Sequence, residues 1–137
     1  MASVIPKEVK KETVDLWLLE TWKVCLLTHD FTYVTTTHVF YEDLTFEVPN
    51  GNGYVTGGAT VSRSPWDVDS GYTGTDAKID AADTSWSGAT FATVRFAVVY
   101  ETTGKKIRAI YEFDGDKSVT SGTFTIQWNA GGLIKIS

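Results

Sequence analysis

The stretch "FATVRFAVVYETTGKKIRAIYEF", residues 91–113, decides the fold because it joins two apolar strands through a tight turn. Apolar side chains fill both alternating sets of positions in residues 91–100, which is typical of a central strand covered on both faces. One face holds Val94, Phe96, Val98 and Tyr100, and the other holds Phe91, Ala97 and Val99. Thr103 and Gly104 predict a hairpin turn into a second strand. The expected inward positions of that strand are Ile107, Ala109, Tyr111 and Phe113.

Shorter strands are expected downstream of this hairpin. The sequence "DGD", residues 114–116, favours a turn, because Asp-Gly pairs tolerate the backbone angles of tight turns. Phe124, Ile126 and Trp128 then alternate with polar residues, as in a strand with one buried face. Gly131-Gly132 predicts a turn into a last strand that contains Ile134 and Ile136.

Upstream, a long loop over residues 29–43 leads to an expected strand around residues 44–48. The stretch "PNGNGYVTGG", residues 49–58, holds Asn-Gly and Gly-Gly pairs, which predict turns. A strand is expected to start near Ala59, and residues 66–69 favour a brief further one. Many short strands at this spacing predict an all-β chain, folded as an antiparallel, jelly-roll-like β-sandwich.

The N-terminal part is divided into an arm and the start of this sandwich. Residues 1–14 are polar and short, so we expect an extended arm, followed by a single β-sandwich domain over residues 15–137. Leu16, Leu19 and Trp22 are spaced for a helical stripe, but residues 22–27 also alternate with period two. We favour two short strands joined near Glu20-Thr21.

Cysteine content and hydropathy limit the classes of protein to be considered. The one cysteine, Cys25, lies in the apolar run "WKVCLLT" and is expected to be a small buried hydrophobe rather than a reactive thiol. The first residues contain no apolar core of a signal peptide, and no run approaches the roughly 20 apolar residues of a membrane span. We therefore expect a protein made in a cytoplasm, with no membrane partner.

The net charge of −5 is unevenly distributed. Residues 24–101 hold three basic and ten acidic residues, whereas residues 102–137 hold five basic and three acidic ones. Binding to phosphate backbones requires clustered Lys and Arg. We therefore expect no nucleic-acid partner.

The sequence contains no pattern that indicates an enzyme. His29 and His38 are nine residues apart, which does not match the tight ligand spacing of a zinc site. "DVDSG", residues 67–71, lacks the glycine at the sixth position and the terminal glutamate of an EF-hand calcium loop. No nucleophile elbow or phosphate-binding loop is present. We predict no catalytic residue, no metal site and no cofactor.

Six segments, taken in order, carry a resemblance. They are "KVCLLTHDF", "THVFYEDLTFEV", "GNGYVTGGATV", "IDAADTSWSGATF", "VRFAVVYETTG" and "DKSVTSGTFTIQWNAGGLIKI". In this order they resemble a family of small structural proteins of tailed bacteriophages, over residues 22–137. Cys25 stands where that family has a small residue. The resemblance implies a virion component without catalytic residues, assigned to capsid decoration, head fibres or tails.

Within the virion, two roles are compared. The first, which we favour, is a decoration or cement protein that binds the major capsid protein or other virion proteins, with Val4, Ile5 and Val9 as candidate attachment residues. The alternative is a tail or head-fibre module that binds host glycans through exposed loop aromatics, with Trp66 and Tyr72 as candidate contacts. Both residues also suit a role as plugs at the ends of the sandwich. A homo-oligomer is expected in either case, because virion parts are used in symmetric sets.

Overall fold

A computed structural model describes residues 12–13, 16–17, 19–64, 77–128 and 134–136 of the chain. Its strands are antiparallel and form two sheets, one with the order β2-β1-β5-β6 and one with the order β3-β4-β7. The strands are β1 (Trp22–Thr28), β2 (Ala59–Thr60), β3 (Arg63–Ser64), β4 (Ala77–Ala81), β5 (Thr84–Glu101), β6 (Ile107–Ile126) and β7 (Ile134–Ile136). One short 3₁₀ helix, η1 (Tyr41–Asp43), lies in the loop between β1 and β2. The all-β, antiparallel class is thus confirmed, while the jelly-roll-like β-sandwich stays a prediction.

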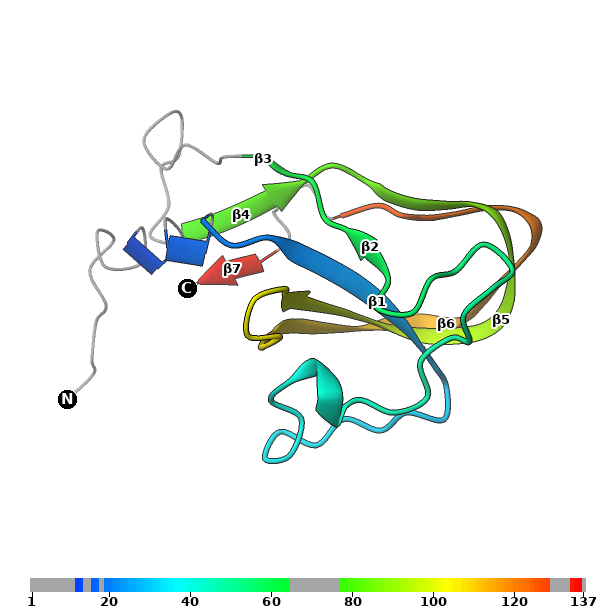
Figure 1. The fold of residues 1–137 in the computed structure, drawn as a ribbon, viewed down its shortest axis with the longest axis horizontal. Helices are drawn as coiled ribbons and strands as arrows, with labels where there is room; N and C mark the ends of the chain where they lie inside the picture. The colour runs from blue at the N-terminus through cyan, green and yellow to red at the C-terminus, as the bar shows by residue number, and fades with distance from the viewer. Residues whose placement is uncertain (1–11, 14–15, 18, 65–76, 129–133, 137) are drawn as a thin grey trace.

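The long hairpin of β5 and β6 is the main element of the fold. Its two strands turn together at one end of the molecule and return on the other side of β1 and β2 (Figure 1). The register between them shifts at several points from Trp86 to Phe96, and Gly88, Thr93 and Ser121 have positive φ there. Such bulges bend strands and increase their twist, so the irregular register is what allows the hairpin to curve over the core.

The main core lies inside this curve. Its buried members come from β1, from the loop between β1 and β2, from the residue after β2, from both halves of β5 and from the end of β6: Trp22, Val24, Leu26, Val48, Tyr54, Val61, Trp86, Ala89, Phe91, Val94, Ala97, Val99 and Ile126. Phe124 and Trp128 pack against it, as their alternation with polar residues predicts. A second cluster lies on the other face of the sheet and consists of Cys25, Leu27, Phe31, Phe96, Val98 and Tyr100. The sequence prediction that β5 is covered on both faces is confirmed.

Individual residues of the hairpin depart from the predicted faces. Val94 belongs to the main core rather than to the face of Phe96, because the strand register shifts between these two residues. Ile107 packs with the second cluster, because β6 has an extra residue, Arg108, between the pairs Val99–Ala109 and Tyr100–Ile107. The turn near Gly104 is confirmed. Glu101 is buried there, and its carboxylate accepts hydrogen bonds from the backbone N–H groups of residues 103, 104 and 106.

Three other predictions are wrong. Leu16 and Trp17 are helical instead of extended, because the backbone bonds within their own turn, with the Leu19 N–H donating to the Leu16 carbonyl. The expected strand over residues 44–48 is reduced to a single bridge between Glu47 and Leu27, and Phe46 has a φ of 64°, which ends regular pairing. Residues 114–116 form no chain reversal but lie within β6.

Burial explains Cys25. Its side chain is fully buried, and burial raises the pKa of the thiol far above its ordinary value. The prediction that Cys25 is buried is confirmed. A raised pKa is typical of an unreactive thiol.

We predict that Gly58→Ala strongly destabilises the fold. Gly58 has a φ of 84°, and a Cβ there would lie 1.8 Å from the carbonyl oxygen of Val24 in β1. The strained φ and the displaced strand together should cost about 3 kcal/mol or more in urea unfolding. Gly51→Ala is the matched control, because Gly51 also has positive φ but open space around it, and it should lose only about 1–2 kcal/mol. Equal losses in the two variants would contradict the close approach of Gly58 to β1.

Candidate functional site

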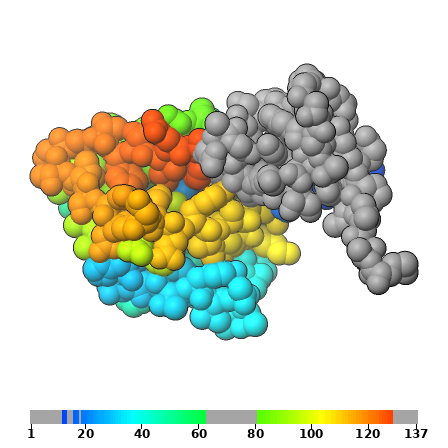
Figure 2. Space-filling view, turned by 180° about the vertical axis from the view of Figure 1, so that it is seen from behind, coloured from blue at the N-terminus to red at the C-terminus, as the bar shows by residue number. Residues whose placement is uncertain are grey.

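The loop between β1 and β2 covers the second cluster and shapes the surface beside it. Phe31 meets Phe96 of β5 edge to face, with ring centroids 5.1 Å apart. Tyr41 of η1 stacks on Tyr100 at 4.7 Å. In the space-filling view this loop, in cyan, lies directly against the yellow residues of β6 (Figure 2). The loop is therefore held on the sheet by its aromatic side chains.

Glu47 fixes the far end of this loop. Its carboxylate accepts hydrogen bonds from the hydroxyls of Tyr41 and Tyr54, at 2.5 and 2.6 Å, and from the Gly57 N–H at 2.7 Å. The Tyr54 hydroxyl in turn accepts a hydrogen bond from the Leu26 N–H of β1. Burial and the bond to Glu47 raise the pKa of Tyr54, so its hydroxyl stays a donor. One carboxylate thus ties three parts of the loop together, and Tyr54 links them to β1.

A groove follows the line where the loop meets β5 and β6. It consists of two adjoining hollows of about 470 and 440 Å³, which share Tyr33, Phe96 and Glu112 as lining residues. The larger hollow is also lined by His38 and Val39 from the loop, by Lys106, and by residues 107–110 of β6. The smaller is also lined by His29, Phe31, Thr32 and Arg95. We call this combined depression the loop–β6 groove.

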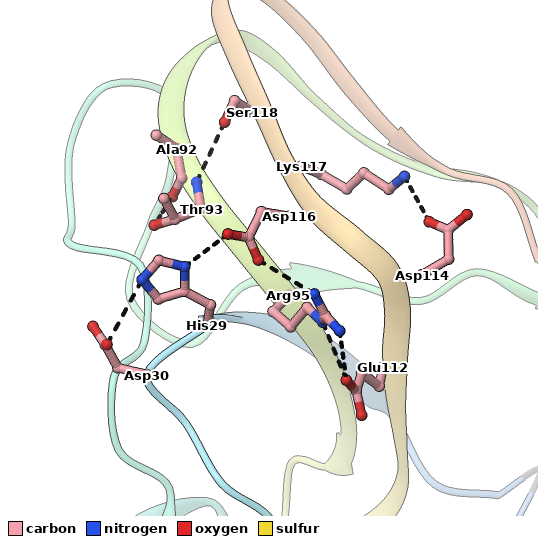
Figure 3. Close-up of polar contacts among 10 residues, drawn as sticks. All are labelled: His29, Asp30, Ala92, Thr93, Arg95, Glu112, Asp114, Asp116, Lys117 and Ser118. Carbon is pink, nitrogen blue, oxygen red and sulfur yellow. Dashed lines mark hydrogen bonds and ion pairs between the residues drawn. The ribbon is translucent and has the colours of Figure 1, made fainter.

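Charged side chains at one end of the groove form a chain of contacts (Figure 3). Arg95 of β5 bonds to the Glu112 carboxylate through Nε and Nη2, at 3.1 and 3.0 Å, and its Nη1 lies 3.6 Å from Oδ1 of Asp116. Oδ2 of Asp116 lies 2.7 Å from Nδ1 of His29. Nε2 of His29 lies 3.7 Å from Oδ1 of Asp30. Arg95 is thus held between two carboxylates.

The irregular pairing of β5 and β6 places these groups together. Val94 pairs with Lys117 and Phe96 with Glu112, so residues 113–116 of β6 lie opposite the single residue Arg95. The extra residues bulge outward at Asp114-Gly115-Asp116. The bulge brings the Asp116 carboxylate within reach of both Arg95 and His29, which a regular strand would not do.

Two pKa values are altered by this arrangement. The hydrogen bond to Asp116 raises the pKa of His29 above its ordinary value. The same hydrogen bond lowers the pKa of Asp116, and the nearby Arg95 charge adds to the effect. Both groups therefore carry their charges over a wider pH range than free side chains do.

His38 has a defined tautomer in the groove wall. The backbone N–H of Val34 donates to His38 Nδ1 at 2.8 Å, so the ring hydrogen of the neutral side chain is on Nε2. The ring stacks on Tyr33, with centroids 5.9 Å apart and planes 24° apart, and it also contacts Phe31. Both histidines lie in the loop after β1, as the sequence suggests for surface or loop residues.

The structure does not describe the candidate site residues from the sequence. Val4, Ile5 and Val9 of the attachment segment and the loop aromatics Trp66 and Tyr72 are all outside the described residues. Sequence reasoning did not identify Tyr33, Arg95, Glu112 or Asp116. The only signal for them was an arginine inside an otherwise apolar strand, at Arg95, which needs a partner when it lies beside a core.

Comparison of the chain with protein-family models, curated proteins and solved structures finds no match. In the part of the chain that the structure describes, His, Cys, Asp and Glu side chains do not gather in a group of three that could hold a metal ion. None of the described helical segments is long and apolar enough to cross a bilayer.

We predict that Asp116→Asn returns the pKa of His29 toward about 6.5, its ordinary value. The raised pKa of His29 stabilises the fold fully below about pH 6.5, and this contribution is lost as the pH rises through the raised value. The lowered pKa of Asp116 stabilises the fold above about pH 4 and is lost as the pH falls through the lowered value.

NMR titration of the His29 ring and urea midpoints of both proteins between pH 3 and 9 measure these effects. The difference between wild type and variant should be largest at about pH 4–6.5. His38→Gln is the matched histidine control, since His38 does not contact Asp116, and it should leave the His29 titration unchanged. A His29 pKa that is the same in wild type and Asp116→Asn would contradict the contact.

Proposed function

We propose that this protein is a non-enzymatic structural protein of a tailed-bacteriophage virion, and that it decorates the capsid. The resemblance of residues 22–137 to phage structural proteins supports the virion, and the structure adds one observation that supports attachment to a protein shell. Leu16 and Leu19 are 65% and 84% exposed, the latter more than any other large apolar side chain among the described residues. They directly follow the N-terminal segment in which attachment was predicted.

Trp17, the described residue between these leucines, is anchored on the sheet. Trp17, between them, packs against the main core and lies 6.1 Å from the ring of Trp22. The guanidinium of Arg108 lies over the Trp17 ring and also binds the Glu20 carboxylate through two hydrogen bonds. The helical turn is thus fixed on the sheet while its two leucines face outward, as a preformed contact surface requires.

This surface suits a decoration protein energetically. Burying one leucine against a partner stabilises a contact by roughly 1.5–3 kcal/mol, which is weak for a single site. Many copies that also contact one another on a repeating shell bind far more tightly than one site does. A protein that binds only the assembled shell stabilises it by mass action. In this proposal the protein binds the major capsid protein. It is a homo-oligomer and is located in the virion.

The alternative role, a tail or head-fibre module that contacts host glycans, was predicted from Trp66 and Tyr72. Both residues lie outside the described part of the chain, so this role stays a prediction on those residues. It differs from decoration in its expected contacts, which are sugars at loops rather than apolar contacts near the N-terminus.

We predict that the double substitution Leu16→Ser, Leu19→Ser weakens binding to heads that lack this protein by at least tenfold. The estimate follows from the loss of one to two leucine burials, at about 1.4 kcal/mol for each factor of ten. Co-sedimentation with purified heads measures the binding, and thermal unfolding of the free variant should be unchanged because both side chains are exposed.

Val55→Ser is the matched control, because Val55 is an equally exposed apolar residue in another loop. It should bind heads like the wild type. Unchanged binding of the double variant, or equal weakening by Val55→Ser, would show that Leu16 and Leu19 do not form the attachment surface.

A further inference from the structure

The loop–β6 groove has the shape and lining of a ligand site that the decoration role does not use. Its two hollows together fall in the size range of small-ligand pockets, about 300–1,000 Å³. Its residues are separate from Leu16 and Leu19. The groove is open to solvent in the isolated chain and is lined on one side by the loop and on the other by β5 and β6.

An exposed aromatic face stands at the centre of the groove. Tyr33 lines both hollows and is 45% exposed. Its ring is supported from behind by the stacked His38 ring, whose position is fixed by the Val34 N–H. The negative face of an aromatic ring attracts partly positive C–H groups, which line one face of a pyranose ring. Tyr33 therefore offers a fixed platform for a sugar ring.

Planar polar groups flank this platform. The Glu112 side chain is 55% exposed, and only its Oε2 atom takes part in the bonds to Arg95. Its Oε1 therefore remains an acceptor for a ligand hydroxyl, while the remaining N–H groups of Arg95 are donors. Because Arg95 is held by Glu112 and Asp116, both groups are oriented before a ligand arrives.

The balance of charges favours a neutral ligand. Arg95 is paired with Glu112 and Asp116, and Arg108, at the other end of the groove, is paired with Glu20. Lys106 also lines the larger hollow, so three cationic side chains stand beside three carboxylates. A phosphate or sulfate would have to compete with these carboxylates for the same guanidinium groups. A hydroxyl-rich neutral ligand can instead bond to both members of each pair without breaking it.

We propose that the loop–β6 groove binds a neutral saccharide, with one pyranose ring stacked on Tyr33 and its hydroxyls bonded to Glu112 and Arg95. This inference goes beyond the decoration role and does not depend on it. It also differs from the alternative role based on Trp66 and Tyr72, because it uses other residues. The source of the sugar is either a bacterial surface polysaccharide or a small free saccharide.

The test is binding of the full-length protein to an array of neutral bacterial polysaccharides, followed by NMR titration with the best oligosaccharide and with glucose and N-acetylglucosamine. Saturable shifts centred on Tyr33, His38 and Glu112 are expected. Binding of oligosaccharides alone indicates the polysaccharide, and equal binding of the monosaccharides indicates a free sugar. Inorganic phosphate, as the anionic probe, should produce no shifts in the groove.

Two variants test whether the saccharide binds in the loop–β6 groove. Tyr33→Ala and Glu112→Gln should each weaken saccharide binding at least tenfold, while Val55→Ala, at an exposed residue outside the groove, should bind like wild type. The Leu16→Ser, Leu19→Ser protein should also bind the sugar normally, so failure of decoration and failure of the groove are distinguished. No saccharide binding on the array, shifts outside the groove, or unchanged binding in both groove variants would overturn the proposal.

Discussion

Burial of β5 on both faces is the constraint on which the rest of this structure depends. Residues 96–100 of β5 contribute alternately to the main core and to the second cluster, and β1 beside them does the same. A slip of one residue would exchange the two faces, so the register of β1, β5 and β6 is strongly specified. Both faces then need a cover. The curved ends of the hairpin cover one face, and the loop between β1 and β2 covers the other, which is where the groove forms.

The same hairpin leaves an edge, because β6 is the outer strand of the four-stranded sheet. Three bulges interrupt it, at Arg108, at residues 113–116 and at residues 120–121, and the loop covers its start, where the Ile107 N–H bonds to the Val39 carbonyl. Bulges and covered ends limit edge-to-edge pairing of sheets. The bulges also aim Arg108 toward Trp17 and Asp116 toward Arg95. Features that protect the edge thus also build both proposed contact surfaces.

The sequence predicted the strands correctly where alternation of apolar residues or a turn-forming residue alone decides the local structure. Alternation in residues 91–100 and the turn at Gly104 predicted the central hairpin, because apolar burial on a strand leaves a direct periodic signal. Prediction from the sequence failed where bulges and positive φ angles decide how the strands pair. "DGD" was interpreted as a turn, although a strand can absorb it as a bulge when a partner such as Arg95 lies opposite. The groove could not be predicted, since Tyr33 is far from Arg95 and Glu112 in the sequence. The contacts of Arg95 with Glu112 and Asp116 depend on the register shifts between β5 and β6.

The most direct test of a capsid role is peptide quantitation by mass spectrometry of purified phage particles, before and after tailless heads are separated. A decoration protein covers many equivalent sites, so we expect hundreds of copies per particle, retained on tailless heads. A few dozen copies or fewer, lost together with the tails, would contradict the decoration role and favour the tail or fibre role. Absence from the particles would contradict the virion assignment itself.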